Sequence, residues 1–289
     1  MANTINWGQA AVENTIDYGQ GATDNTISWG KSQTLSPGGE TNITGAGGTP
    51  AFSNVNSFTF DGVDEYFVGV GTYSELDAQN KATISFWIKP PSTITSIQVI
   101  SSVRINTSAS NKQFQIQLYT SGLIALEQDS GSKYIRGNSS ALNLGQWNHV
   151  LFCFDTTQGS SANRGRVFIN GTNETLATSV SGTFATATGG LYIAENQNGQ
   201  YNPFDGLIDE FAIWAGTDQR ANVSEIYSSS GAVDLNNLPT APQPTTWQRF
   251  GDNGATWNGF AWSMTDVNGS YVNRGVNMVE ANRTTDVPT

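Results

Sequence analysis

The chain has 289 residues, of which 13% are charged, and 24 acidic against 13 basic side chains give a formal net charge of −11. A chain this acidic is repelled by phosphate backbones, which argues against nucleic acid as its partner. No apolar run reaches the ~20 residues of a membrane-spanning helix, and residues 1–6 lack the basic and apolar regions of a secretory signal. The single cysteine, Cys153, excludes a disulfide framework, and its apolar neighbours predict a small buried side chain.

Residues 1–35 contain three similar hexapeptides, NTINWG, NTIDYG and NTISWG, spaced eleven residues apart. Their Asn, Thr, Ile and Gly residues are mediocre or poor helix formers. In an extended chain, each Ile and the aromatic residue two positions later lie on the same side. We therefore expect three short strand-and-turn units. Because repeats this short cannot bury their own apolar surface, they predict an assembly interface formed by Ile5, Trp7, Ile16, Tyr18, Ile27 and Trp29.

Residues 36–51 form a connector rich in Gly and Pro, after which short alternating runs extend from about residue 52 to residue 238. In one such run, Ile84, Phe86 and Ile88 alternate with more polar residues. Period-two patterning with turn residues between the runs predicts antiparallel sheets packed face to face. We expect one helix, within residues 217–228. The predicted core includes Phe86, Phe114, Phe152, Val167 and Phe211.

Residues 239–289 begin with a Pro-rich linker and continue with few aliphatic residues. The segment is too short to build a core of its own, yet it carries Trp247, Trp257 and Trp262. We therefore expect a small C-terminal appendage whose tryptophans, like the aromatic residues of the repeats, contact another subunit or protein.

Five motifs occur in order between residues 58 and 214: FTFDGVDEY, ISFWIKP, WNHV, VFING and FDGLIDEFAIW. In sequence and order they resemble the laminin-G-like, concanavalin-A-like jelly-roll family. The resemblance covers about two thirds of the chain and implies an all-β fold. The expected fold is one antiparallel jelly-roll β-sandwich over residues 52–238, with the repeats before the sandwich and the appendage after it.

The resemblance also implies Ca²⁺ near the closing strands of the domain, with Asp61 and Asp209 at the matching positions. Calcium requires six to eight oxygen ligands, so these two carboxylates would need carbonyls and water as further ligands. In the alternative role, both carboxylates cap turns and accept backbone hydrogen bonds.

Catalytic patterns are absent from the sequence. His149 is the only histidine, and it lies in the WNHV motif rather than near a Gly-x-Ser-x-Gly elbow. The Glu-x-Asp-x-Glu pattern of sandwich glucanases does not occur either. We therefore expect a protein that is not an enzyme. A polar loop at residues 195–202 has the composition of a glycan-binding loop, with Asn198 and Tyr201 as its candidate contacts, and also that of an ordinary turn.

The favoured interpretation is a structural protein of a tailed-bacteriophage virion: a capsid decoration, fibre or tail component made in the host cytoplasm. The repeats look like assembly segments of such proteins. They would dock on other virion proteins, as part of a homo-oligomer, and the sandwich would face cell-surface glycans. The alternative is a free carbohydrate-binding module or adhesin of a bacterium.

Overall fold

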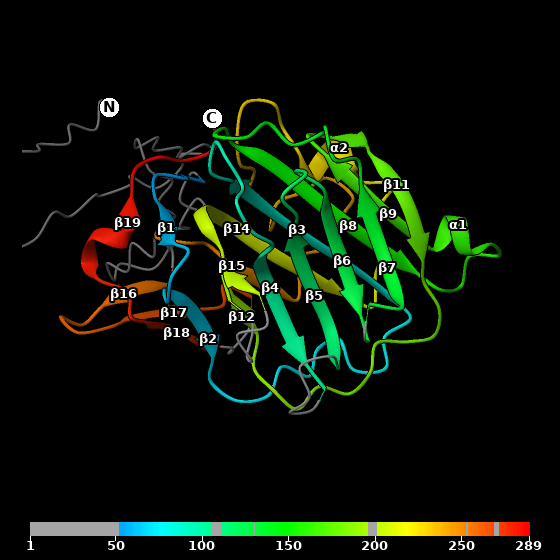
Figure 1. Ribbon diagram of the computed structural model, residues 1–289, viewed down its shortest axis with the longest axis horizontal. Helices are drawn as coiled ribbons and strands as arrows, with labels where there is room; N and C mark the ends of the chain where they lie inside the picture. The colour runs from blue at the N-terminus through cyan, green and yellow to red at the C-terminus, as the bar shows by residue number, and fades with distance from the viewer. Residues whose placement is uncertain (1–51, 106–110, 130, 196–200, 253, 269–271) are drawn as a thin grey trace, which may run out of the picture. The chain divides into compact units, whose positions relative to one another are not determined.

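The computed structural model describes residues 52–105, 111–129, 131–195, 201–252, 254–268 and 272–289 (Figure 1). Residues Asn54–Thr289 form one compact unit. The repeats and the connector, with their predicted strand-and-turn units and interface residues, lie outside the described residues. No helix among those described is long and apolar enough to cross a bilayer.

Two sheets form the fold, and all pairs of strands but one are antiparallel. The eight-stranded small sheet runs in the order β10 (Thr172–Asn173), β9 (Gly165–Ile169), β8 (Asn148–Asp155), β3 (Lys81–Lys89), β14 (Asp205–Ala215), β1 (Ser57–Asp61) and β19 (Arg283–Thr284), with β15 (Thr246–Gln248) paired to β14. The eleven-stranded large sheet runs in the order β11 (Thr175–Ser179), β7 (Lys133–Gly137), β6 (Ile124–Gln128), β5 (Lys112–Leu118), β4 (Gln98–Arg104), β12 (Tyr192–Ile193), β2 (Tyr66–Gly69), β18 (Val272–Val276), β17 (Trp262–Thr265) and β16 (Ala255–Trp257), with β13 (Asn202–Pro203) parallel to β4.

The core lies between the two sheets, as the alternating pattern predicted. On β3, Ile84, Phe86 and Ile88 face this core, and the residues between them face outward. All five side chains predicted to be inside are at most 1% exposed: Phe86, Phe114, Phe152, Val167 and Phe211. The predicted all-β sandwich is therefore confirmed, and Cys153 is buried as expected.

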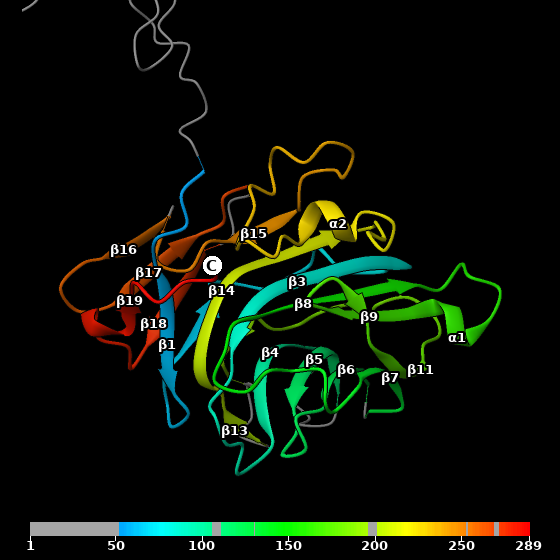
Figure 2. The same cartoon turned by 90° about the horizontal axis from the view of Figure 1, so that it is seen from above.

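The outer faces of the two sheets differ. Figure 2 shows α2 (Val223–Ile226) and the connections around it lying over the small sheet, on the side away from the large sheet. The predicted helix is limited to these four residues. Before it, the backbone N–H of Gln219 donates to Thr83 Oγ1 on β3. The other helical turns are α1 (Ser161–Arg164) and η1 (Glu280–Asn282). No described helix or strand lies over the outer face of β5–β7 in Figure 2.

The C-terminal residues are part of the sandwich and not a separate appendage. β15 extends the pairing of β14, β18 pairs with β2, and β19 pairs with β1. Trp247 and Trp262 are each 2% exposed. Trp262 packs edge-on against Phe58, with ring centroids 4.9 Å apart. The prediction that Trp247 and Trp262 contact another subunit or protein is therefore wrong, because the sandwich itself buries both side chains. Trp257 is half-buried.

Candidate functional site

Alternation along β5 produces a polar outer surface on the large sheet. Phe114, Ile116 and Leu118 enter the core, whereas Gln115 and Gln117 face the other way. Gln115 lies opposite Ser102 on β4 and Glu127 on β6. We call the surface around this row the polar face. Its members are Ser102, Arg104, Lys112, Gln115, Gln117, Tyr119, Glu127, Tyr134, Arg136 and Tyr192.

An irregularity in the pairing of β4 with β5 brings Lys112 onto this face. The register shifts between Val103 and Arg104, so Arg104 lies opposite Lys112 and Gln113 is skipped. Lys112 consequently reaches Glu127, whereas the Gln113 amide donates to Asp77 and Ala185 O. Strict alternation along residues 113–118 would place Gln113, and not Lys112, on this face. The bulge of one residue changes which of the two side chains faces outward.

Glu127 connects three side chains of the polar face. Its carboxylate accepts hydrogen bonds from Lys112 Nζ at 3.2 Å and Tyr119 Oη at 2.8 Å, and it lies 3.8 Å from the Arg136 guanidinium. Burial lowers the pKa of Lys112, and Glu127 partly offsets this. Burial and the hydrogen bond to Glu127 raise the pKa of the Tyr119 phenol. Tyr119 therefore remains a hydroxyl donor at neutral pH.

Two glutamines of the polar face have no hydrogen-bond partner. Gln115 and Gln117 are both fully buried, and neither the nitrogen nor the oxygen of either amide is hydrogen-bonded. A buried amide without a partner costs about 1–3 kcal/mol, and such groups in a folded protein call for an explanation. Each amide offers donors and an acceptor, the pairing that a hydroxyl group can satisfy.

Tyrosine rings lie on the same face of the sheet as these amides. Tyr66 and Tyr192 stack at 5.8 Å, and the Arg136 guanidinium lies 4.0 Å from the centre of the Tyr134 ring. Tyr66, Tyr119, Tyr134 and Tyr192 are all half-buried, so each keeps part of its surface accessible. Rings with an apolar face and a polar hydroxyl suit ligands that are apolar on one side and polar at the edges.

The predicted glycan loop reaches the polar face at both of its described ends. Ser102 Oγ donates to Glu195 O at 3.2 Å. At the other end, Tyr201 is close enough to Tyr119 to help raise the pKa of that phenol. Asn198 lies outside the described residues. The loop singled out by its composition therefore adjoins the polar face at these two ends. The sequence held no sign that β4 and β5 lie beside it.

The two carboxylates predicted to share calcium are far apart. Strand pairing places Asp61 opposite Asp205, and Asp209 lies four residues further along β14, about 13 Å at the usual rise of a strand. Asp61 accepts a hydrogen bond from Val63 N, and Asp209 from Glu210 N. These are the backbone contacts of the alternative role. Among the described residues, no group of three or more His, Cys, Asp or Glu side chains is placed to hold a metal ion.

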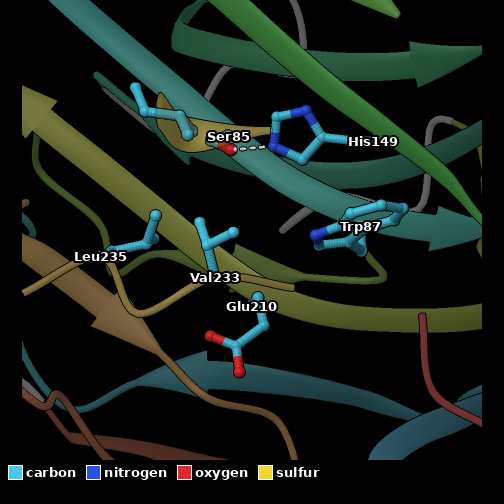
Figure 3. Close-up of a pocket in the computed structure, with 7 residues that line it drawn as sticks. Ser85, Trp87, His149, Glu210, Val233 and Leu235 are labelled. Atoms are coloured by element: carbon cyan, nitrogen blue, oxygen red, sulfur yellow. Dashed lines mark hydrogen bonds between the residues drawn. The ribbon is translucent and has the colours of Figure 1, made fainter. Parts of the chain in front are cut away.

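A small pocket lies on the outer face of the small sheet (Figure 3). Its lining includes Ser85, His149 and Glu210, and its volume of about 10 Å³ is room for one water molecule. Ser85 Oγ and His149 Nε2 are 2.8 Å apart, while Nδ1 has no partner. In Figure 3 the Glu210 carboxylate points away from the histidine. Burial lowers the pKa of His149 to about 3, so the imidazole is neutral at pH 7. Because Nδ1 has no partner, the carboxylate that orients the histidine of a catalytic triad is not in place here.

Glu210 instead joins β14 to the C-terminal strands. Its carboxylate accepts hydrogen bonds from Trp247 Nε1 at 2.5 Å and Arg249 Nε at 3.0 Å. Arg249 also pairs with Asp252 at 3.6 Å. Burial raises the pKa of Glu210 to about 7, against the opposing effect of Arg249. Burial, followed by the charge of Glu210, raises the pKa of Asp209.

Comparisons with known proteins agree with this fold. The family model described as the concanavalin A-like lectin/glucanases superfamily matches residues 61–224. A search of curated proteins finds no match.

Similar solved structures include a Bacteroides ovatus protein described as a candidate carbohydrate-binding protein, with a TM-score of 0.57 and 15% identity over 82% of this chain. The present chain spans 62% of that protein. A heptameric SAP-like pentraxin of Limulus polyphemus has a TM-score of 0.48 and 20% identity, with 78% of this chain and 97% of that one covered. The CBM40 domain of a Ruminococcus gnavus sialidase, bound to sialyllactose, has a TM-score of 0.43 and 15% identity, with 61% and 100% covered.

Proposed function

Because the chain belongs to the concanavalin A-like lectin/glucanase superfamily, we propose that it is a carbohydrate-binding protein without catalytic activity, which holds its glycan on the polar face. The resemblance seen in the sequence thus supports the fold, whereas the ligand is proposed from the site. The superfamily fold alone does not decide function, since one fold carries many activities.

The observation that carries this proposal is the pair of unpartnered amides, Gln115 and Gln117. They lie on the outer side of the large sheet, where no described helix or strand covers β5–β7 in Figure 2, and four half-buried tyrosines lie on the same side. Sugar hydroxyls can both donate to and accept from an amide, and a tyrosine ring can pack against the apolar side of a sugar ring. Polar groups placed at a few fixed points beside aromatic surface are typical of binding sites for small ligands.

The test compares the wild-type chain with Gln117→Leu and Tyr134→Ala on an array of oligosaccharides. Leucine has a similar volume and removes an unsatisfied buried amide, so Gln117→Leu should leave the melting temperature unchanged or raised. We expect it to weaken glycan binding at least about tenfold, and Tyr134→Ala to do the same.

The matched control is Phe260→Ala, on the connection between β16 and β17, where Phe260 is 91% exposed. It should bind glycans like the wild type. Retention of full binding by both Gln117→Leu and Tyr134→Ala would contradict the proposed site. Absence of binding to every oligosaccharide on the array would contradict the proposed function.

A second candidate function follows from the repeats in residues 1–35. We propose that this segment docks the chain, as part of a homo-oligomer, on other proteins of a bacteriophage virion and leaves the polar face directed outward. Deletion of residues 1–35 should then leave a folded sandwich that no longer enters particles. Normal incorporation of the truncated protein would favour a free carbohydrate-binding module or adhesin.

A further inference from the structure

We infer that the interior corner of the sandwich formed by β15, β17 and β18 is a binding site for a calcium ion. Its proposed ligands are two carboxylates and two amide oxygens, which belong to Glu75, Asp266, Gln248 and Asn273. The inference goes beyond the proposed function and does not depend on it. The strands that form this corner follow residue 224, so they lie outside the part of the chain that the family model matches.

The two amides point into the core, one from each sheet. Gln248 on β15 lies opposite Phe211 on β14, which is a core residue, and residues directly opposite each other in an antiparallel pair share a face. Asn273 on β18 lies opposite Met264 on β17, which is also a core residue. Both amides are completely buried, and neither the nitrogen nor the oxygen of either has a hydrogen-bond partner.

The segments that carry these amides meet at the end of β17. Trp247 N donates to Asp266 Oδ1 at 2.9 Å, and Val267 N donates to Trp247 O at 3.0 Å. Gln248 therefore follows a residue that is bonded to the chain just after β17, whereas Asn273 pairs with β17 at Met264. An extended chain places residues 264 and 266 on the same face. Both amides thus approach the same inward side of this segment.

Two carboxylates come together at this corner. The Thr246 hydroxyl donates to Glu75 at 2.7 Å and lies 2.9 Å from the Tyr73 hydroxyl. Asp266 is 3% exposed, and its Oδ2 has no hydrogen-bond partner. Burial raises the pKa of Asp266, and the charge of Glu75 adds to this increase. Neither carboxylate forms an ion pair within the described part of the chain.

A calcium ion would satisfy the carboxylates and the amides together. Its charge offsets two carboxylates that act on each other, and carboxylate and amide oxygens are ligands that Ca²⁺ accepts among its six to eight. Glu75 is half-buried, so water can reach the ion on that side, complete the coordination and accept from the amide nitrogens. Mg²⁺ fits less well, because it requires a near-ideal octahedron and gives up its water reluctantly.

This corner differs from the acidic groups considered above. It contains two carboxylates, so it is not one of the groups of three or more His, Cys, Asp or Glu side chains that the described residues lack. The buried amides without partners are the independent sign of a ligand, since such groups call for an explanation.

The experiment strips the full chain of divalent ions by chelation and then titrates it with Ca²⁺, Mg²⁺ or Tb³⁺. By calorimetry we expect a single Ca²⁺ per chain, bound at least about tenfold more tightly than Mg²⁺. Ca²⁺ at about 100 times its Kd should raise the melting temperature by about 5 °C or more. Tb³⁺ in the place of Ca²⁺ should luminesce when tryptophan is excited, because Trp247 is bonded to Asp266.

Two variants test the ligands. Asp266→Asn removes a charge with little change of shape and should weaken Ca²⁺ binding and the Tb³⁺ signal at least about tenfold. Gln248→Leu removes an unsatisfied buried amide, so without Ca²⁺ it should melt at the temperature of the wild type or higher. With Ca²⁺ it should gain less than the wild type gains. The matched control is Asp61→Asn, since Asp61 and Asp205 are another pair of carboxylates on opposite strands. It should bind Ca²⁺ like the wild type.

Absence of Ca²⁺ binding would overturn the inference and would leave the two amides to buried water. Binding that persists unchanged in both Asp266→Asn and Gln248→Leu, or that Asp61→Asn abolishes, would overturn the inference as well, because the ion would then lie elsewhere. Circular dichroism of each variant establishes that it is folded. The oligosaccharide array decides the proposed function separately.

Discussion

Glu210 occupies an irregular position on β14, where the pairing with β3 shifts between Asp209 and Ala212. Its backbone has a φ of 50°, in the left-handed region that non-glycine residues rarely adopt. This conformation places two adjacent carboxyl groups, those of Asp209 and Glu210, in the interior. The charge of Asp252 acts on Asp209, and Arg249 forms ion pairs with Glu210 and Asp252. Negative charge therefore exceeds positive charge inside the fold, which favours uptake of a proton.

The stability of the protein should consequently fall as the pH rises from about 4.5 to about 7. Glu210 titrates at 4.5 when unfolded and at about 7 when folded, so within this window the folded state holds a proton that the unfolded state has released. The shift corresponds to ~3 kcal/mol of unfolding free energy. Urea titrations at half-unit pH intervals measure this slope.

Glu210→Gln should reduce the slope, although the amide also weakens one of the two hydrogen bonds. Glu225→Gln is the matched control, because Glu225 is held by Thr240 and its pKa is lowered, outside the window. Hydrogen bonds from Thr157 and Gln158 similarly hold the pKa of Asp155 at about 2. The contribution of Asp155 to the unfolding free energy is therefore lost only below the pH window of Glu210. A stability curve that is flat from pH 4.5 to 7 would contradict the buried proton.

The strands that follow residue 245 contribute part of the core. Trp262 on β17 packs against Phe58 on β1, and its indole N–H donates to Val279 O at 2.9 Å. Trp262→Ala should lower the unfolding free energy by about 3–5 kcal/mol, since it leaves a cavity and an unpaired carbonyl. Phe260→Ala, on the same hairpin but exposed, should change it by less than about 0.5 kcal/mol. Equal effects of the two substitutions, measured by denaturant unfolding, would contradict the packing role of β17.

Period-two alternation predicted the inner strands because it is a local property of each segment. Pairing between distant segments leaves no such local trace: β2 at residues 66–69 pairs with β18 at residues 272–276. The hairpin of β16 and β17 had a usable signal, since Asn258-Gly259 separates two Trp-bearing runs. With that signal, Trp262 would have been assigned to a sheet and not to an intermolecular surface.

The candidate site was less predictable than the fold. Tyr201 was identified from loop composition, but Gln115 and Gln117 have the same pattern as any half-exposed strand. Both amides lack hydrogen-bond partners in the folded chain. For Gln117 this follows from its neighbours across the sheet, Val99 and Ala125, which have no polar side chain. The expected pairing of Asp61 with Asp209 failed because the register of two strands is set by the whole sheet and not by the motifs.

On the scale of the whole molecule, Asn54–Thr289 has a complete core without the first residues of the chain. Removal of residues 1–51 should therefore leave the melting temperature within a few degrees of that of the full chain. Differential scanning calorimetry of both proteins measures this. A loss of the cooperative transition in the shorter protein would mean that the repeats complete the fold.

The first and last strands of this unit are neighbours. Ser57 at the start of β1 lies opposite Thr284 at the end of β19, and the Ser57 hydroxyl donates to Asp286 O at 2.6 Å. A mechanical load applied between the two ends would pull this antiparallel pair open like a zipper, breaking one hydrogen bond at a time. The two large sheets would be loaded in shear only after this pair has separated. Shear would have to break many backbone hydrogen bonds at the same time. Under tension from both ends the molecule should yield first at β19, whereas a sandwich tethered through one end alone would not transmit force through that strand.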